Sequence, residues 1–161
     1  MIKAGVLTLS DKGAQGQRFD ESGPIIQEIL RGHDIETGIY EIIPDAYDTI
    51  VDRLKTWTDE LALPLIVTTG GTGLAPRDVT PEATLAVIER RVPGMEEVMR
   101  MESLKKTPHA MISRAVVGVR KRTLIVNLPG SPKAVQDCLG AVISALPHAL
   151  AKLSGDMSEC A

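Results

Sequence analysis

The sequence contains few aromatic residues and few cysteines, and these shortages exclude several classes of protein. Its 161 residues include one Trp, two Tyr and one Phe, too few for the base-stacking surfaces of proteins that bind single-stranded nucleic acid. The net charge of −3 also argues against nucleic-acid binding, which requires an excess of basic residues. Because Cys138 and Cys160 form no Cys-x-x-Cys pair, neither a disulfide scaffold nor a zinc site is expected.

Long hydrophobic runs are missing as well. No apolar stretch approaches the ~20 residues that cross a membrane, and the apolar run at residues 4–9 is too short for a signal peptide. We therefore expect no membrane partner and a cytoplasmic location. Hydrophobic residues nevertheless make up 43% of the chain, enough for a full core, and the length predicts a single domain over residues 1–161.

The chain does contain an alternation of strand and helix patterns. Short apolar runs predict buried strands, and apolar residues spaced three or four apart predict helices. The predicted strands are 2–9, 35–43 and 63–68, and the predicted helices are 24–31, 46–61, 81–90, 94–104 and a long helix from residue 132, which Pro147 should kink or break. Apolar runs 115–119 and 123–127, split by three basic residues, predict a hairpin. The fold class is therefore α/β, with a mostly parallel sheet covered on both faces and an antiparallel hairpin strand.

A glycine-rich loop follows the third predicted strand and is the strongest functional signal. It consists of Thr69, Gly70, Gly71, Thr72 and Gly73. Glycines let the backbone adopt positive φ and approach a ligand closely, and successive N–H groups in such a loop form an anion-binding nest. The loop matches neither the Walker A pattern nor G-x-G-x-x-G. We interpret it as a phosphate-binding loop, with a plain glycine-rich connection as the alternative.

Two aspartates are expected to lie beside this loop. Asp78 lies near its end, before the helix that Thr80 should cap and Pro81 should begin, and Asp45 follows the second strand. The carboxyl ends of parallel strands meet at one edge of a sheet, so both carboxylates could bind Mg²⁺ together with substrate phosphates. The alternatives are that Asp45 caps a helix and that Asp78 is a turn residue.

A second strand-to-helix junction lies at residues 127–133. Ser131 should cap the last helix and Pro132 should begin it. Lys133 then falls in the first turn, where the helix dipole disfavours a cation. A bound anion would remove this conflict, and an exposed, salt-screened lysine is the alternative.

Two further segments carry polar residues that could reach an anion. Residues 20–24 open the first predicted helix and could contact an anion at its N-terminus, although helix capping also explains them. Ser113 and Arg114, close to His109, could reach a phosphate, with the packing of the hairpin as the alternative.

Taken together, these motifs resemble the MogA/MoaB family of molybdenum-cofactor biosynthesis. The matching segments are residues 8–11, 68–73, 77–82, 113–116 and 127–133, so the resemblance covers essentially the whole chain. The segment Asn-Leu-Pro-Gly-Ser-Pro at residues 127–132 makes the chain more similar to the MogA branch than to the MoaB branch.

The family resemblance implies a three-layer α/β/α sandwich, usually a homotrimer, with the activity of a molybdopterin adenylyltransferase. Such an enzyme transfers AMP from Mg-ATP to the terminal phosphate of molybdopterin and releases pyrophosphate, and a downstream molybdenum-insertion protein would be a partner. The alternative is a MoaB-like binding or scaffold protein without adenylylation. The two aspartates weigh against it, because a pure binder would not need a second acid near the phosphates.

Together with the residue patterns, the resemblance also implies roles for individual residues. Asp78 and Asp45 would serve catalysis and hold Mg²⁺. The residues expected to bind molybdopterin and its phosphate are Ser10, Asp11, Thr69, Gly70, Gly71, Thr72, Gly73, Ser113 and Arg114. The residues expected to bind the nucleotide are Asp20, Ser22, Gly23, Pro129, Gly130, Ser131 and Lys133.

Overall fold

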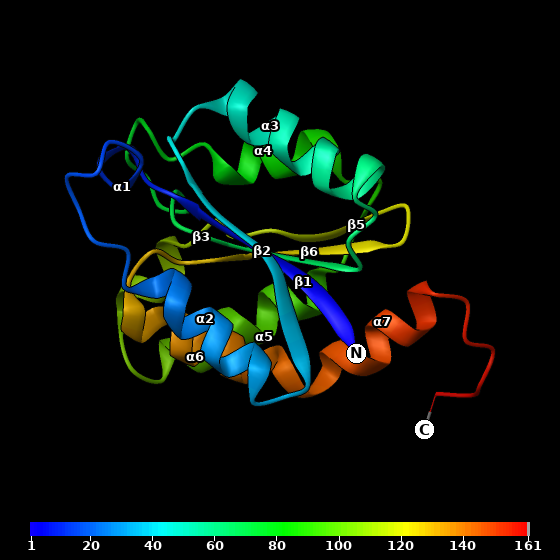
Figure 1. Cartoon of the computed structure of the whole chain (residues 1–161). Helices are drawn as coiled ribbons and strands as arrows, with labels where there is room; N and C mark the ends of the chain where they lie inside the picture. Colours follow the sequence, from blue (N-terminus) through cyan, green and yellow to red (C-terminus); the bar gives the residue numbers. More distant parts are fainter. Residues whose placement is uncertain (161) are drawn as a thin grey trace.

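A mixed β-sheet runs through the centre of the molecule (Figure 1). The computed structural model describes residues 1–160, so that only the last residue of the predicted domain 1–161 lies outside the described residues. The described residues form six strands in the order β2-β1-β3-β6-β5-β4. The strands are β1 (Ile2–Leu9), β2 (Ile35–Ile43), β3 (Leu65–Thr69), β4 (Arg90–Arg91), β5 (Val117–Arg120) and β6 (Thr123–Leu128). Strands β2, β1, β3 and β6 are parallel, whereas β5 and β4 are antiparallel to their neighbours.

Helices cover both faces of this sheet (Figure 1). On one face lie α3 (Tyr47–Lys55) and α4 (Thr80–Val87), and on the other lie α2 (Ser22–Arg31), α5 (Pro93–Leu104), α6 (Pro132–Val142) and α7 (Leu146–Leu153). Each face has its own apolar core cluster. Strands β3 and β6 are buried at every position, which explains their unbroken apolar runs. The predicted α/β/α sandwich with a mostly parallel sheet and an antiparallel hairpin is confirmed.

Two predicted helices differ in detail from the structure, and the break predicted in the last helix is present. The predicted helix 46–61 changes to a π-helix at Thr56–Glu60, where Trp57 is buried. The predicted helix 81–90 ends at Val87, because the backbone N–H of Glu89 donates to Val119 and Arg90–Arg91 pairs with β5 as strand β4. The last helix is interrupted as predicted: a 3₁₀ turn at Ile143–Ala145 precedes α7, and Pro147 lies in the first turn of α7, where proline is tolerated.

The stretch Pro132–Leu153 differs from the expectation that no apolar segment approaches the length needed to cross a membrane. It is 22 residues long and, by length and composition alone, could cross a membrane. In the structure it is divided into α6, the 3₁₀ turn and α7. Its apolar residues Val135, Leu139, Leu146 and Leu150 are buried in the larger core cluster, as expected of a core helix.

The carboxyl ends of the four parallel strands meet at one edge of the sheet. The segments that follow them begin with Ser10, Pro44, Gly70 and Pro129. Ser10 caps the short helix α1 (Asp11–Ala14), since its hydroxyl accepts a hydrogen bond from the N–H of Gly13 at 3.0 Å. This edge is where ligands bind in open α/β sheets.

Candidate active site

Two clefts open at this edge and meet at the glycine loop, sharing Gly71, Asp78, Gly130 and Ser131 as lining residues. One has a volume of about 600 Å³ and is lined by strand ends and the loop between α1 and α2; we call it the acidic cleft, after Asp20, Glu21, Asp45 and Asp78 in its wall. The other has a volume of about 580 Å³ and lies against α5 and α6; we call it the α5–α6 cleft.

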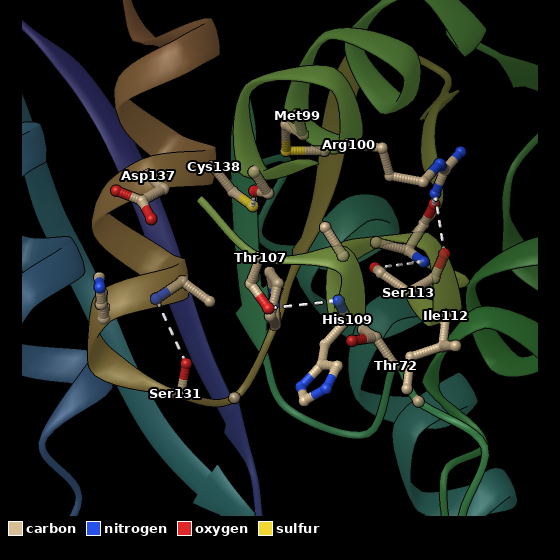
Figure 2. A pocket seen from close by; sticks show the side chains of 18 of the residues that line it. Thr72, Met99, Arg100, Thr107, His109, Ile112, Ser113, Ser131, Asp137 and Cys138 are labelled. Atoms are coloured by element: carbon tan, nitrogen blue, oxygen red, sulfur yellow. Dashed lines mark hydrogen bonds between the residues drawn. The ribbon is translucent and has the colours of Figure 1, made fainter. Parts of the chain in front are cut away.

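The α5–α6 cleft has an apolar wall with polar residues around it. Figure 2 shows Met99 from α5, Cys138 from α6, and Ile112 and Ser113 from the end of the 3₁₀ helix η2 (Pro108–Ile112). His109 of the same 3₁₀ helix lines this cleft too. The sequence offered no signal for this wall, because its residues come from elements far apart in the chain.

The glycine loop has the backbone conformation that its sequence predicts. Gly70 and Gly71 have φ of 101° and 67°, in the left-handed region that glycine favours. A Cβ on Gly70 would collide with the carbonyl oxygen of Leu9, and a Cβ on Gly71 would collide with the hydroxyl of Thr80. Thr80 is not the N-cap that we predicted: helix α4 is capped at Val79, and the Thr80 hydroxyl donates to the carbonyl of Gly70 at 2.9 Å.

Two hydroxyls predicted to bind ligands hold the glycine loop and the start of α2 against the junction at residues 129–131. Thr69 Oγ1 donates to the carbonyl oxygen of Pro129 at 2.6 Å, and Ser22 Oγ donates to that of Gly130 at 2.7 Å. Both residues line the acidic cleft, but the hydrogen atoms of their hydroxyls are used within the protein. They therefore fix the shape of the floor between the two clefts.

Asp45 has the least satisfied side chain of the site. Its Oδ2 accepts the N–H of Asp11 at 3.1 Å, whereas its Oδ1 is buried and has no hydrogen-bond partner within residues 1–160. This Oδ1 lies 3.0 Å from where a Cβ on Gly71 would be. Burial raises the pKa of Asp45, and the nearby charges of Asp11 and Asp78 raise it further. The alternative of a helix cap is wrong, because Ala46 is the N-cap of α3.

Asp78 lies where the two clefts meet. Its Oδ2 accepts the N–H of Ala75 at 3.0 Å, so it does stabilise a turn, as the alternative interpretation proposed. No group of three His, Cys, Asp or Glu residues in the described part of the chain is arranged as a metal site. Mg²⁺, however, is commonly held by only one or two carboxylates, with phosphates and water as its other ligands. The unpartnered Oδ1 of Asp45, with Asp78 close by, fits that requirement.

Asp20 lines the acidic cleft, but its carboxylate is held by hydrogen bonds within the protein, and its role in binding the nucleotide stays a prediction. Its carboxylate accepts hydrogen bonds from Thr8 Oγ1 at 2.7 Å, from the N–H groups of Ser22 and Gly23 at 3.1 Å each, and from the hydroxyl of Tyr40. Burial and the Asp20 charge raise the pKa of Tyr40. Gly23 packs against Asp20 and Tyr40 and does not itself line either cleft among the described residues.

Arg114 is also held within the protein. Its guanidinium donates from Nε to the carbonyl of Gly73 at 2.9 Å and from Nη2 to that of Asp78 at 2.8 Å, and its Nη1 contacts both carboxylate oxygens of Glu82 at 2.6 and 2.9 Å. All three of its nitrogens therefore have partners within the protein, and Arg114 clamps the loop in this structure. Ser113 does line the α5–α6 cleft, and its hydroxyl accepts a long 3.4 Å hydrogen bond from the Ala115 N–H.

Asp11 forms an ion pair and does not line either cleft among the described residues. Its carboxylate accepts hydrogen bonds from Arg77, from Nε at 3.0 Å and from Nη2 at 2.9 Å. The Arg77 guanidinium lowers the pKa of Asp11. No role for Arg77 could be predicted from the sequence, because its partner Asp11 lies 66 residues away.

The N-terminus of α6 is built as predicted. Ser131 is the N-cap and accepts the N–H of Ala134 at 3.2 Å, and Pro132 lies in the first turn (Figure 2). Lys133 follows in that turn and lines the α5–α6 cleft. It has no ion-pair partner among residues 1–160, so its charge is available to an anion in the cleft.

Comparison with known proteins matches this chain to one family. The family model described as "Probable molybdopterin binding domain" covers residues 5–148. A curated relative from Helicobacter pylori, named "Molybdopterin adenylyltransferase", is 45% identical over 160 residues, which cover 98% of this chain and 91% of the relative. The "Molybdenum cofactor synthesis protein cinnamon" of Drosophila melanogaster is 43% identical over 98% of this chain. The chain spans only 26% of the length of that protein and 22% of "Gephyrin" from Dictyostelium discoideum.

Solved structures give the same result. A crystal structure of the "Molybdopterin biosynthesis enzyme MoaB" from Thermus thermophilus is 51% identical, with a TM-score of 0.92, and the match covers 97% of this chain and 98% of that one. A structure titled as MogA is 37% identical with a TM-score of 0.89, covering 94% and 99%. Both branch names thus occur among the similar structures. The chain belongs to the MogA/MoaB family of molybdopterin-binding domains that act in molybdenum-cofactor biosynthesis.

Proposed function

We propose that the chain is a molybdopterin adenylyltransferase, which transfers AMP from Mg-ATP to the terminal phosphate of molybdopterin. The observation that carries this proposal is the meeting of two clefts at Gly71 and Asp78. An enzyme that joins two substrates needs a subsite for each and a shared centre for the reacting atoms. The curated relative from Helicobacter pylori carries the name of this activity at 45% identity.

The reaction needs alignment more than it needs a base. The terminal phosphate of molybdopterin is ionised near pH 7 and can attack the α-phosphorus of ATP directly. A phosphorus–oxygen bond forms on that side while the bond to the pyrophosphate leaving group breaks. The chain must hold both substrates so that this line of attack crosses the shared floor of the clefts.

The developing negative charge faces several fixed donors. Backbone N–H groups of the glycine loop and the N-terminus of α6 present partial positive charge at this floor, and Lys133 adds a full charge from the first turn of α6. Because Thr69, Ser22 and Arg114 hold these segments through hydrogen bonds within the protein, the donors do not need to reorganise when the substrates bind.

Asp45 and Asp78 would hold Mg²⁺ at the junction of the clefts. A bound Mg²⁺ would neutralise charge on the phosphate oxygens of the nucleotide. Asp45 Oδ1 offers a buried acceptor that nothing in the described chain satisfies, which costs free energy in the ligand-free protein. Such a cost is common at functional sites, and a protein that only bound the pterin would have no use for it.

Incubation of the purified protein with molybdopterin, MgCl₂ and ATP labelled at the α-phosphorus tests the proposal. We expect label to move to molybdopterin in step with pyrophosphate release. Asp78→Asn should abolish most of this turnover. The matched control Asp52→Asn, on the exposed surface of α3, should not. Tight binding of molybdopterin without pyrophosphate release would contradict the proposal and favour the binding or scaffold protein.

Three further properties belong to this proposal. We infer a homotrimer from the family resemblance, a cytoplasmic location, and delivery of the product to a downstream molybdenum-insertion protein. The single domain over residues 1–161 likewise stays a prediction. The helix faces that could join copies carry exposed apolar residues, among them Leu85, Val98 and Met101.

A further inference from the structure

Arg77 is largely exposed, yet its guanidinium has one fixed orientation. Its side chain is 64% exposed, and both Nε and Nη2 donate to the carboxylate of Asp11 at 3.0 and 2.9 Å. A bidentate pair of this kind fixes the direction of a carboxylate as well as neutralising it. Because the pair is exposed, it contributes little to global stability. The functional consequence of this ion pair must therefore lie in the contacts that Asp11 makes with Asp45.

Asp11 holds Asp45 through a reciprocal pair of hydrogen bonds. The N–H of Asp45 donates to Asp11 Oδ1 at 3.0 Å, and the N–H of Asp11 donates to Asp45 Oδ2 at 3.1 Å. These two hydrogen bonds join the segment after β1 to the segment after β2. The ion pair with Arg77 adds the segment that follows the glycine loop, so the Asp11 carboxylate connects the segments that follow β1, β2 and β3.

The orientation of the Asp45 carboxylate follows from these contacts. Its two oxygens turn together about one torsion, so that fixing Oδ2 on the Asp11 N–H also fixes Oδ1. The fixed position of Oδ1 is the buried one beside Gly71, where it has no partner in the described chain. Asp11 also places a second negative charge near Asp45, and the Arg77 guanidinium compensates it.

We propose that Arg77 is a positioning residue, which orients the cation-binding oxygen of Asp45 by fixing Asp11. This inference rests on the proposed function for its kinetic consequences, but its structural content concerns only the three residues. Without Arg77, the Asp11 carboxylate loses the two hydrogen bonds that hold it in one plane, so its acceptance of the Asp45 N–H is no longer fixed. The segment that carries Asp45 would then be tied less firmly to the segment after β1, and the uncompensated charge of Asp11 would repel the Asp45 carboxylate.

The first measurement is equilibrium binding of Mn²⁺, used as a paramagnetic probe for the Mg²⁺ site, in the presence of a non-hydrolysable ATP analogue. Loss of a group that orients a metal-binding carboxylate typically weakens metal affinity or activity by roughly 10- to 100-fold. Arg77→Ala should show a loss in this range, and Arg77→Lys should recover part of it, because lysine keeps the charge but not the bidentate geometry. The control Arg122→Ala, at the hairpin on the opposite edge of the sheet, should bind Mn²⁺ as the wild type does.

The second measurement separates positioning from direct binding and from folding. In steady-state adenylylation, Arg77→Ala should lower kcat while the KM for ATP and the melting temperature change little. In an Asp11→Asn background, where the ion pair is already lost, Arg77→Ala should add no further effect on Mn²⁺ binding. Wild-type Mn²⁺ affinity in Arg77→Ala, additivity with Asp11→Asn, a raised KM at constant kcat, or a large loss of melting temperature would each overturn the proposal. Failure of the wild type to adenylylate would refute the proposed function and leave the Mn²⁺ comparison intact.

Discussion

The unpartnered oxygen of Asp45 predicts that removal of its charge stabilises the ligand-free protein while it impairs catalysis. Asp45→Asn keeps the shape of the side chain and an oxygen that can accept the N–H of Asp11, as Oδ2 does at 3.1 Å. It removes a negative charge that burial and the carboxylates of Asp11 and Asp78 disfavour. We therefore expect the variant to melt above the wild type at neutral pH.

The size of the effect follows from the environment of this oxygen. An unsatisfied buried polar group costs about 1–3 kcal/mol, and part of that cost remains when an amide N–H takes the place of Oδ1. Solvent also screens a carboxylate that is only partly buried, so the net gain should be about 1 kcal/mol. For a domain of this size that gain raises the melting temperature by roughly 2–4 °C.

The gain depends on pH, because the pKa of Asp45 is raised in the folded protein. The folded state then holds the proton to higher pH than the unfolded chain does, so protonation of Asp45 favours folding. Below the ordinary Asp pKa of 3.8, Asp45 is protonated in both states and does not lower the free energy of unfolding of the wild type. The destabilisation by its charge grows as the pH rises through the pKa of Asp45 in the folded protein. The difference in melting temperature between Asp45→Asn and the wild type should thus be largest at neutral pH and approach zero near about pH 4.

Scanning calorimetry of wild type, Asp45→Asn and the control Asp52→Asn over this pH range measures the effect. Addition of Mg²⁺ with an ATP analogue should reverse the order, because only the wild type gains free energy from binding the cation. A variant that melts below the wild type at neutral pH would refute the reasoning. A gain that persists unchanged at pH 4 would also refute it, since charge would not then be its cause.

Three other predictions test the site and the assembly. Asp78→Asn should lose most turnover and keep its affinity for molybdopterin in a binding titration; near-normal turnover would remove Asp78 from the catalytic machinery. Lys133→Ala should weaken binding of an ATP analogue by about one charge-assisted hydrogen bond, roughly 1.5–3 kcal/mol, without loss of melting temperature, because the cation opposes the α6 dipole. Isothermal titration that finds unchanged affinity would make Lys133 an ordinary surface lysine. Light scattering should give about three times the chain mass, and a monomer at micromolar concentration would contradict the trimer.

The strands and most helices could be predicted because their signal is local. Strands β1 and β2 occupy the predicted residues 2–9 and 35–43. Strand β4 could not be found, since Arg90–Arg91 has no strand pattern and pairs only because β5 lies beside it. The same holds for the π-helix Thr56–Glu60, whose residues would continue α3 without difficulty by propensity alone.

The site shows the same limit for charged residues. The sequence predicts that Asp45 and Asp78 lie beside the glycine loop, because their place after a strand or loop is a topological signal, and both line the acidic cleft. It does not predict the internal partners of Asp20 and Arg114, because a sequence does not show which partner a charge will find. Arg114 pairs with Glu82, 32 residues away, and Asp20 accepts from Tyr40, 20 residues away. In this chain, charges near the glycine loop are used to hold the surrounding segments.

Some charged residues near the clefts are paired within the protein, and the others are available to bind the phosphates of the substrates. Arg77 and Arg114 brace the two flanks of the glycine loop through Asp11 and Glu82, so part of the hydrogen-bonding capacity of each guanidinium is used within the protein. Of the described cations that line the clefts, Lys133 in the α5–α6 cleft and Arg18 in the acidic cleft have no ion-pair partner. A site that transfers a nucleotidyl group must balance several phosphate charges at once. Under the proposed function, the braced loop would supply fixed dipoles, and further positive charge would come from these two residues and from the Mg²⁺ proposed at Asp45 and Asp78.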